Sequence, residues 1–147
     1  MSSSSDLIAT VPLFARCSAK TIERMAAAAT ERHFAEGTNI VTEGDSGVAL
    51  YVIAEGTAAV VHAGEPVPRA TLRKGDSFGE MAIVDGRPRS ATIRATSAVT
   101  CLALPRWDFI AELRGDDQLA MELIGRMSAR IRDLEGIVQE LEGQTKS

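Results

Sequence analysis

The spacing of apolar residues divides the chain into three zones. From about residue 6 to 34, helix-forming residues dominate and glycine is absent. From about residue 36 to 104, short β-branched and apolar runs alternate with glycine turns. From residue 105 to 141, apolar residues return at intervals of three and four. This order predicts an α+β fold in which a sheet structure stands between two helical parts.

The first zone predicts N-terminal helices. Ser18 is a good N-cap for the alanine-rich run that follows it. Leu13 and Phe14, after Pro12, predict a short apolar turn that docks on the rest of the fold. The serine-rich residues 1–5 are expected to form a disordered lead-in. One domain is therefore expected over residues 6–147, with its helical part at 6–35.

The middle zone, residues 36–104, predicts a small antiparallel β-roll, similar to a jelly roll. Gly56 and Gly75 mark tight turns between runs of strand-forming residues. Several short strands with turn residues at regular spacing are typical of such rolls and barrels. The predicted strands are residues 39–42, 50–53, 57–61, 91–95 and 99–104.

The third zone, residues 105–142, predicts two helices. Pro105 suits a helix start, and Gly115 with the two aspartates after it breaks the segment. The second helix is expected at residues 117–142. It carries an apolar stripe with the alternating spacing of a and d positions in heptads. The stripe consists of Ala120, Ile124, Met127, Ile131, Leu134, Val138 and Leu141.

Two interpretations of this stripe remain open. The whole helix can pack on its own roll, or its C-terminal half can pair with a second copy in a homodimer. The last turns extend beyond the reach of a small roll, which favours pairing. Gly125 and Gly136 oppose a very stable coil, because a glycine inside a helix costs about 1 kcal/mol relative to alanine.

Composition and charge narrow the classes of function. The chain has 147 residues, 45% hydrophobic and 24% charged, as expected for one soluble domain. Its net charge of -4 disfavours nonspecific binding to nucleic acid, which needs a basic face. It has no apolar run long enough to span a membrane and no signal-peptide pattern at its start, so it is expected to be cytoplasmic.

Metal binding and catalysis both lack a sequence signal. Cys17 and Cys101 fit no metal-ligand spacing, and His33 and His62 form no ligand cluster, so no metal is expected. Each histidine is treated as an ordinary strand or surface residue. The chain also lacks a nucleophile elbow, a Walker A loop and an acid–base pair at a telling spacing, so it is not expected to be an enzyme.

Residues 75–92 carry the strongest chemical pattern. A glycine turn leads into Phe78 and a short apolar run, which predicts a brief helix whose free N–H groups attract anions. Arg89, just before a strand, can give a phosphate two parallel hydrogen bonds. Glu80 cannot bind phosphate, but its carboxylate can accept hydrogen bonds from sugar hydroxyls. Together they suit a ligand that carries one phosphate beside a ribose.

This stretch closely resembles the phosphate-binding cassette of the cyclic-nucleotide-binding domain family. The similarity lies in Phe-Gly-Glu-Met-Ala at 78–82 and Arg-Pro-Arg-Ser-Ala-Thr at 87–92. The family includes regulatory subunits of protein kinase A, bacterial cyclic-AMP receptor transcription factors and cyclic-nucleotide-gated channels. The resemblance implies an eight-stranded β-roll, a cassette at 75–92, and B and C helices over 105–142.

The resemblance also implies roles for individual residues. Glu80 would bind the ribose 2′-hydroxyl, and Arg89 would pair with the cyclic phosphate. Backbone N–H groups of the cassette and the Ser90 hydroxyl would complete the ribose and phosphate contacts. By alignment with channel members, Arg130 on the last helix would cap the purine, with Ile131 and Leu134 as apolar alternatives; otherwise Arg130 is an ordinary exposed residue. The candidate ligand-binding set is Phe78, Gly79, Glu80, Met81, Ala82, Arg89, Ser90, Ala91 and Arg130.

The base of the nucleotide is less clearly defined by the sequence. A hydroxyl residue directly after the phosphate arginine can hold guanine in some family members, so Ser90 leaves cyclic GMP open. Cyclic AMP is favoured, because serine also occupies this place in many proteins that resemble cyclic-AMP binders. Four apolar residues could contact the base or belong to the core: Val60, Val61, Leu72 and Ile83.

The predicted function is a regulatory or sensor module that binds cyclic AMP and signals through closure of its C-terminal helix. The alternative is a cyclic GMP or dual binder cut from a larger transcription factor, channel or kinase-type protein. No helix-turn-helix follows the last helix, so direct DNA binding is not expected, and the effector protein is unknown. A degenerate dimer scaffold is a third reading, but the intact Glu80 and Arg89 oppose it.

Overall fold

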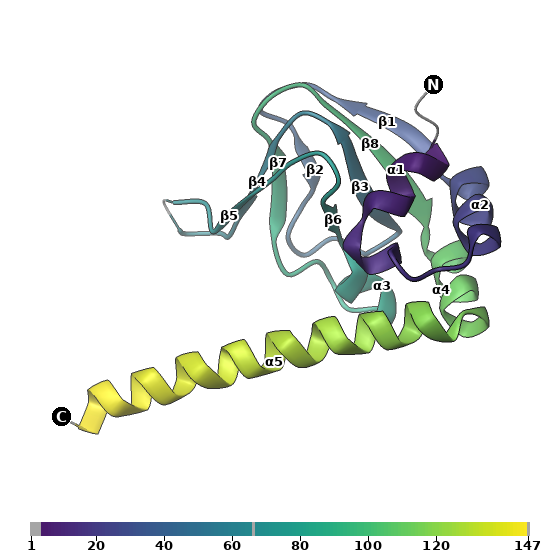
Figure 1. Ribbon diagram of the computed structural model, residues 1–147. Coiled ribbons are helices and arrows are strands. Elements are labelled where there is room, and N and C mark those ends of the chain that lie inside the picture. The colour runs from purple at the N-terminus through teal and green to yellow at the C-terminus, as the bar shows by residue number, and fades with distance from the viewer. Residues whose placement is uncertain (1–3, 66, 147) are drawn as a thin grey trace.

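The computed structural model describes residues 4–65 and 67–146, and its core is a β-roll of two antiparallel sheets. One sheet has the strand order β1-β8-β3-β6 and the other β2-β7-β4-β5 (Figure 1). The strands within the described residues are β1 (Thr30–Phe34), β2 (Asn39–Val41), β3 (Ala49–Glu55), β4 (Ala58–Val61), β5 (Ala70–Leu72), β6 (Ser77–Phe78), β7 (Thr92–Ala95) and β8 (Val99–Pro105). The predicted β-roll is therefore confirmed.

Helices cover one side of the roll and run beneath it. The N-terminal elements α1 (Ser4–Thr10), the short 3-10 turn η1 (Pro12–Phe14) and α2 (Ala19–Ala28) stack beside α4 (Arg106–Gly115) at one end of the sheets (Figure 1). The short helix α3 (Glu80–Asp85) follows β6, and the long helix α5 (Asp117–Lys146) passes under the roll and projects beyond it (Figure 1). The predicted N-cap is confirmed, because the Ser18 hydroxyl accepts a hydrogen bond from the Thr21 N–H at 3.2 Å.

The strands β3 and β8 separate two hydrophobic clusters. Successive side chains of a strand point to opposite faces. Leu50 and Val52 of β3 accordingly pack with the helices, whereas Tyr51 and Ile53 pack between the two sheets. Burying a large apolar side chain stabilises the fold by about 1.5–3 kcal/mol. The same two strands therefore hold the helical layer and close the roll.

Part of the predicted N-terminal zone is wrong. Residues 6–35 were expected to be helical, but Thr30–Phe34 form β1, which pairs with β8 over all five of its residues. Its first four side chains are exposed, so the strand lacks the apolar alternation that would reveal it. Of the predicted disordered lead-in, Ser4 and Ser5 form the first turn of α1, and residues 1–3 lie outside the described residues. The short strands β5 and β6 were also not predicted.

The apolar stripe of α5 changes environment along the helix. At the start of the helix, Leu119 and Leu123, which lie beside the stripe, are buried in the hydrophobic cluster with the other helices. Within the stripe, Ala120 and Met127 are partly buried, whereas Ile124 and all members from Ile131 onward are exposed, with 52% of Leu134 and 56% of Leu141 accessible. The whole helix therefore does not pack on its own roll, and pairing of the C-terminal half with a second copy stays a prediction.

Candidate ligand-binding site

A cavity of about 230 Å³ lies between the inner faces of the roll, α3 and α5. All nine residues that the sequence singled out line it, although their contacts with a ligand stay a prediction. Of the four apolar candidates, Val60 and Leu72 line the cavity. Ile83 instead belongs to the hydrophobic core beside the helices, and Val61 is not among the lining residues. The structure thus brings together the cassette residues, apolar side chains of the strands β2, β4, β5 and β7, and one residue of α5.

Arg89 is a buried cation held by neutral acceptors. Only 6% of the residue is exposed. Its guanidinium donates hydrogen bonds to the carbonyl oxygens of Ala49, at 2.7 Å, and Gly79, at 3.2 Å. No carboxylate in the described part of the chain forms an ion pair with it. Burial lowers the pKa of Arg89, although Tyr51 and Glu80 act in the opposite direction. Because arginine stays charged in proteins, the cavity wall carries a buried positive charge that no ion pair among the described residues neutralises.

The side chains beneath Arg89 form a rigid floor. The rings of Tyr51 and Phe78 stack with centroids 5.3 Å apart and planes at 12°. The Arg89 guanidinium carbon lies 5.9 Å from the centroid of Tyr51. Tyr51 and Phe78 come together because β3 pairs with β6 at these two residues. The stacked rings therefore help to hold the Arg89 guanidinium in place, ready to bind an anion.

Gly79 allows Arg89 and Glu80 to occupy neighbouring positions. It caps α3 with φ 97° and ψ 2°, a conformation that residues with a side chain rarely adopt. A Cβ atom at Gly79 would overlap the Arg89 guanidinium. The carboxylate of Glu80, at the first residue of α3, thus stands beside a fixed cation without forming an ion pair with it. Such an arrangement offers one group to an anion and the other to hydroxyls.

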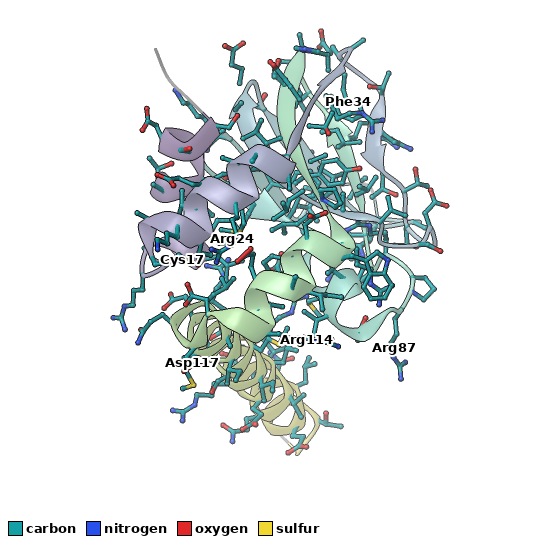
Figure 2. All side chains as sticks on the ribbon, turned by 90° about the vertical axis from the view of Figure 1, so that its right-hand side faces the viewer. Cys17, Arg24, Phe34, Arg87, Arg114 and Asp117 are labelled. Carbon is teal, nitrogen blue, oxygen red and sulfur yellow. The ribbon has the colours of Figure 1, made fainter. Side chains whose placement is uncertain are left out.

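Two exposed arginines differ in their position relative to the cavity. Arg130 of α5 is exposed, yet it lines the cavity and also the adjoining groove beside Glu80 and Met81. Arg87, only two residues before Arg89, lies on an exposed turn and points away from the body of the fold (Figure 2). Arg130 therefore borders the cavity, as a capping residue would have to, while Arg87 has no place in it.

His62 is a lining residue that the sequence did not identify. Its Nδ1 atom lies 3.6 Å from the Glu43 Oε1 atom, and 23% of its side chain is exposed. The sequence predicted a strand at residues 57–61, and His62 lies just beyond its end, so the alternation of strand side chains did not extend to it. The other histidine, His33 of β1, lies within hydrogen-bond distance of the Thr100 hydroxyl on the neighbouring strand β8, and it does not line the cavity. Within the described residues, no group of three metal-ligating side chains forms a candidate metal site.

The chain is similar in sequence to proteins of a known family. The sequence profile described as "Cyclic nucleotide-binding domain" matches residues 31–116, more than half of the chain. This chain therefore belongs to the cyclic nucleotide-binding domain family. It is 34% identical over 99 residues to the cAMP-dependent protein kinase regulatory subunit of Yarrowia lipolytica, covering 67% of this chain and 26% of that protein. It is 43% identical over 74 residues to the cGMP-dependent protein kinase of Toxoplasma gondii, covering 50% and 7%.

A solved structure supports the same assignment. The crystal structure of Thermus thermophilus catabolite activator protein superposes with a TM-score of 0.79 at 30% identity, over 89% of this chain and 63% of that one. The match with the Yarrowia lipolytica kinase regulatory subunit, in contrast, spans only about a quarter of the length of that protein. None of the described helices is both long enough and apolar enough to cross a bilayer.

Proposed function

We propose that this domain is a sensor for cyclic AMP and that it performs no catalysis itself. The observation that carries the proposal is the cationic Arg89, buried at the cavity wall with carbonyl partners and no ion pair among the described residues. A buried charge of this kind is destabilising unless an anion faces it, so it favours a ligand that brings one. A cyclic phosphate fits, because a guanidinium offers it two parallel charge-assisted hydrogen bonds.

The remaining groups of the cavity suit the rest of a nucleotide. Glu80 can accept a hydrogen bond from the ribose 2′-hydroxyl, and the Ser90 hydroxyl and cassette N–H groups can complete the contacts to phosphate and sugar. The apolar wall, which includes Val60 and Leu72, is a suitable surface for a purine. We propose cyclic AMP as the preferred ligand and cyclic GMP as the alternative. Ser90 and the relatives named for each nucleotide leave both ligands in the test.

Calorimetric titration with both nucleotides tests the proposal directly. Wild type should bind cyclic AMP more tightly than cyclic GMP. Arg89→Ala should weaken binding about 10- to 150-fold, because it removes a charged hydrogen-bond donor worth about 1.5–3 kcal/mol. The matched control is Arg87→Ala, an exposed arginine two residues away that should bind like wild type. A wild type that binds neither nucleotide, or an Arg89→Ala variant that binds as well as Arg87→Ala, would refute the phosphate site.

The signal we propose is closure of α5 over the bound base. The supporting observation is that Arg130 borders the cavity although it belongs to an otherwise exposed stretch of helix. An arginine plane can stack on a purine, and a ligand that contacts α5 only in a closed state would shift the population towards that state. Spin labels on α5 and the roll should report a shorter distance when cyclic AMP is added. The Arg130→Ala variant should bind more weakly and show a smaller change; an unchanged distance in wild type would refute closure.

We also propose that the C-terminal half of α5 pairs with a second copy of the chain. The support is the exposed stripe of Ile131, Leu134, Val138 and Leu141, which has heptad spacing. Sedimentation equilibrium should find a dimer for wild type. Leu134→Glu should shift it to a monomer, because a charge would be buried in the seam. Glu135→Gln, on the neighbouring position of the same helix, is the control and should leave the dimer intact. A monomeric wild type would refute pairing.

A further inference from the structure

His62 borders the apolar part of the cavity from the side of β4 and β7. His62 directly follows the last residue of β4, and it lines the cavity together with Val60, whereas Val61 between them does not. In the antiparallel pairing of β4 with β7, Val61 lies opposite Thr92. Ala91, the residue just before Thr92, also lines the cavity. The imidazole therefore belongs to the site and not to the outer surface.

His62 lies where the base of a bound nucleotide is expected. If Arg89 holds the phosphate and Glu80 the ribose, the base must lie against the remaining wall. That wall contains apolar side chains from four strands, namely Val41, Val60, Leu72 and Ile93. Apolar side chains can bind the faces of a purine, but they cannot recognise its polar edge. His62 is a polar side chain at the border of this wall, so its free ring nitrogen can supply such recognition.

The Glu43 carboxylate faces one of the two ring nitrogens of His62. The Nδ1 atom of His62 lies 3.6 Å from the Glu43 Oε1 atom. Glu43 is itself held beside β7, because its backbone N–H donates a hydrogen bond to the Thr92 hydroxyl at 2.9 Å. A second carboxylate whose charge interacts with His62 is that of Glu65, and Arg69 binds it through two hydrogen bonds. In the tautomer that carries its proton on Nδ1, towards Glu43, Nε2 is the hydrogen-bond acceptor of the ring.

We propose that His62 accepts, through Nε2, a hydrogen bond from the 6-amino group of an adenine base, with Glu43 as the residue that orients the ring. This inference rests on the proposed cyclic nucleotide function and adds a base-reading residue to it. A neutral acceptor at this place favours a purine with an amino group over one without it. Without that group, the Nε2 atom of His62 would lose its contact with water and gain no hydrogen bond in exchange.

A pair of ligands that differ only in the amino group tests this contact. Cyclic AMP and the 3′,5′-cyclic phosphate of purine riboside, which has hydrogen in place of the amino group, are titrated into wild type and His62→Ala by calorimetry. Wild type should bind cyclic AMP about 3- to 10-fold more tightly than the analogue, as one neutral hydrogen bond predicts. In His62→Ala this ratio should fall to about one, because cyclic AMP loses affinity and the analogue does not.

Two further variants and two controls make the result specific. His62→Gln keeps an acceptor oxygen and should restore part of the ratio, whereas Glu43→Gln should reduce it by releasing the ring. Circular dichroism melts check that each variant is folded. An unchanged ratio in His62→Ala, or an equal loss for both ligands, would overturn the inference. Arg89→Ala separates the two proposals: if wild type binds and Arg89→Ala does not, a failed ratio counts against His62 alone. If wild type binds neither ligand, the proposed function fails, and the base contact fails with it.

Discussion

Replacing Gly79 by alanine should weaken ligand binding strongly without any loss of a functional side chain. Gly79 has φ 97°, and a Cβ atom there would overlap the Arg89 guanidinium and approach the Ala49 carbonyl oxygen to 3.3 Å. The backbone cannot relax easily, because Ala49 lies in the central strand β3. The Arg89 side chain is the mobile partner, so it should leave its two carbonyl acceptors and its place at the cavity wall.

The size of the effect follows from two contributions. A side chain forced into such a backbone conformation costs about 1–3 kcal/mol of folding stability. For a domain of this size, each 1 kcal/mol lowers the melting temperature by about 2–4 °C. Displacement of Arg89 removes the charged contact with the ligand, which should weaken cyclic AMP binding by about 10- to 150-fold. The first contribution, backbone strain, lowers the stability of the fold, and only the second, the displacement of Arg89, lowers the affinity for the ligand.

Gly86→Ala separates the two contributions, because Gly86 caps the other end of α3 with φ 70°. Its Cβ would come within 3.1 Å of the Arg106 side chain, away from the cavity. This variant should lose about 1–2 kcal/mol of stability but bind cyclic AMP within about twofold of wild type. Thermal melts and calorimetry on both variants measure the difference. If Gly79→Ala binds like Gly86→Ala, the position of Arg89 is not what the ligand requires.

Three further outcomes follow from the fold. Phe109→Ala should cost about 3–5 kcal/mol in urea unfolding, because Phe109 is fully buried with its ring edge-on to Phe14 at 6.2 Å; a loss below 1 kcal/mol would contradict this packing. Burial raises the pKa of the Cys101 thiol to about 12, so iodoacetamide at pH 8 should modify it only in denaturant, as intact-mass spectra would show. Burial acts to raise the pKa of Asp116, but hydrogen bonds, including one from the Leu119 N–H, outweigh it and hold the pKa below its usual value. Asp116 therefore caps the N-terminus of α5. The stability from this cap is present above the pKa of the carboxyl group in the unfolded chain and is lost as the pH falls through its pKa in the folded chain. Asp116→Ala should cost about 0.5–2 kcal/mol at pH 7 and nothing in acid, and an equal cost at both pH values would contradict the cap.

The candidate site was mostly predictable because it is mostly contiguous. Residues 78–92 carry the positive-φ turn, the carboxylate and the arginine within one short stretch, so their types and spacing suggest the chemistry directly. The arginine whose side chain enters the cavity could also be told from its neighbour: Arg89 immediately precedes the run of strand formers, whereas Arg87 belongs to the turn. Structure places Arg89 in the cavity and Arg87 in solvent, in agreement with that distinction.

By itself, the sequence determined the β-roll between two helical parts, five of its strands and the cassette, because each depends on residues close together in the chain. Tertiary structure alone decided the contacts between distant segments. It made Thr30–Phe34 a strand, because the backbone of β8 supplies its hydrogen-bond partners. The polar side chains of this segment give no sign of that pairing in the sequence. It brought Glu43, after β2, to His62, after β4, across the single strand β7, and it placed Arg130 at the cavity from a helix whose end extends beyond the roll. Local periodicity encodes which face a residue occupies, but only the folded chain determines what stands opposite that face.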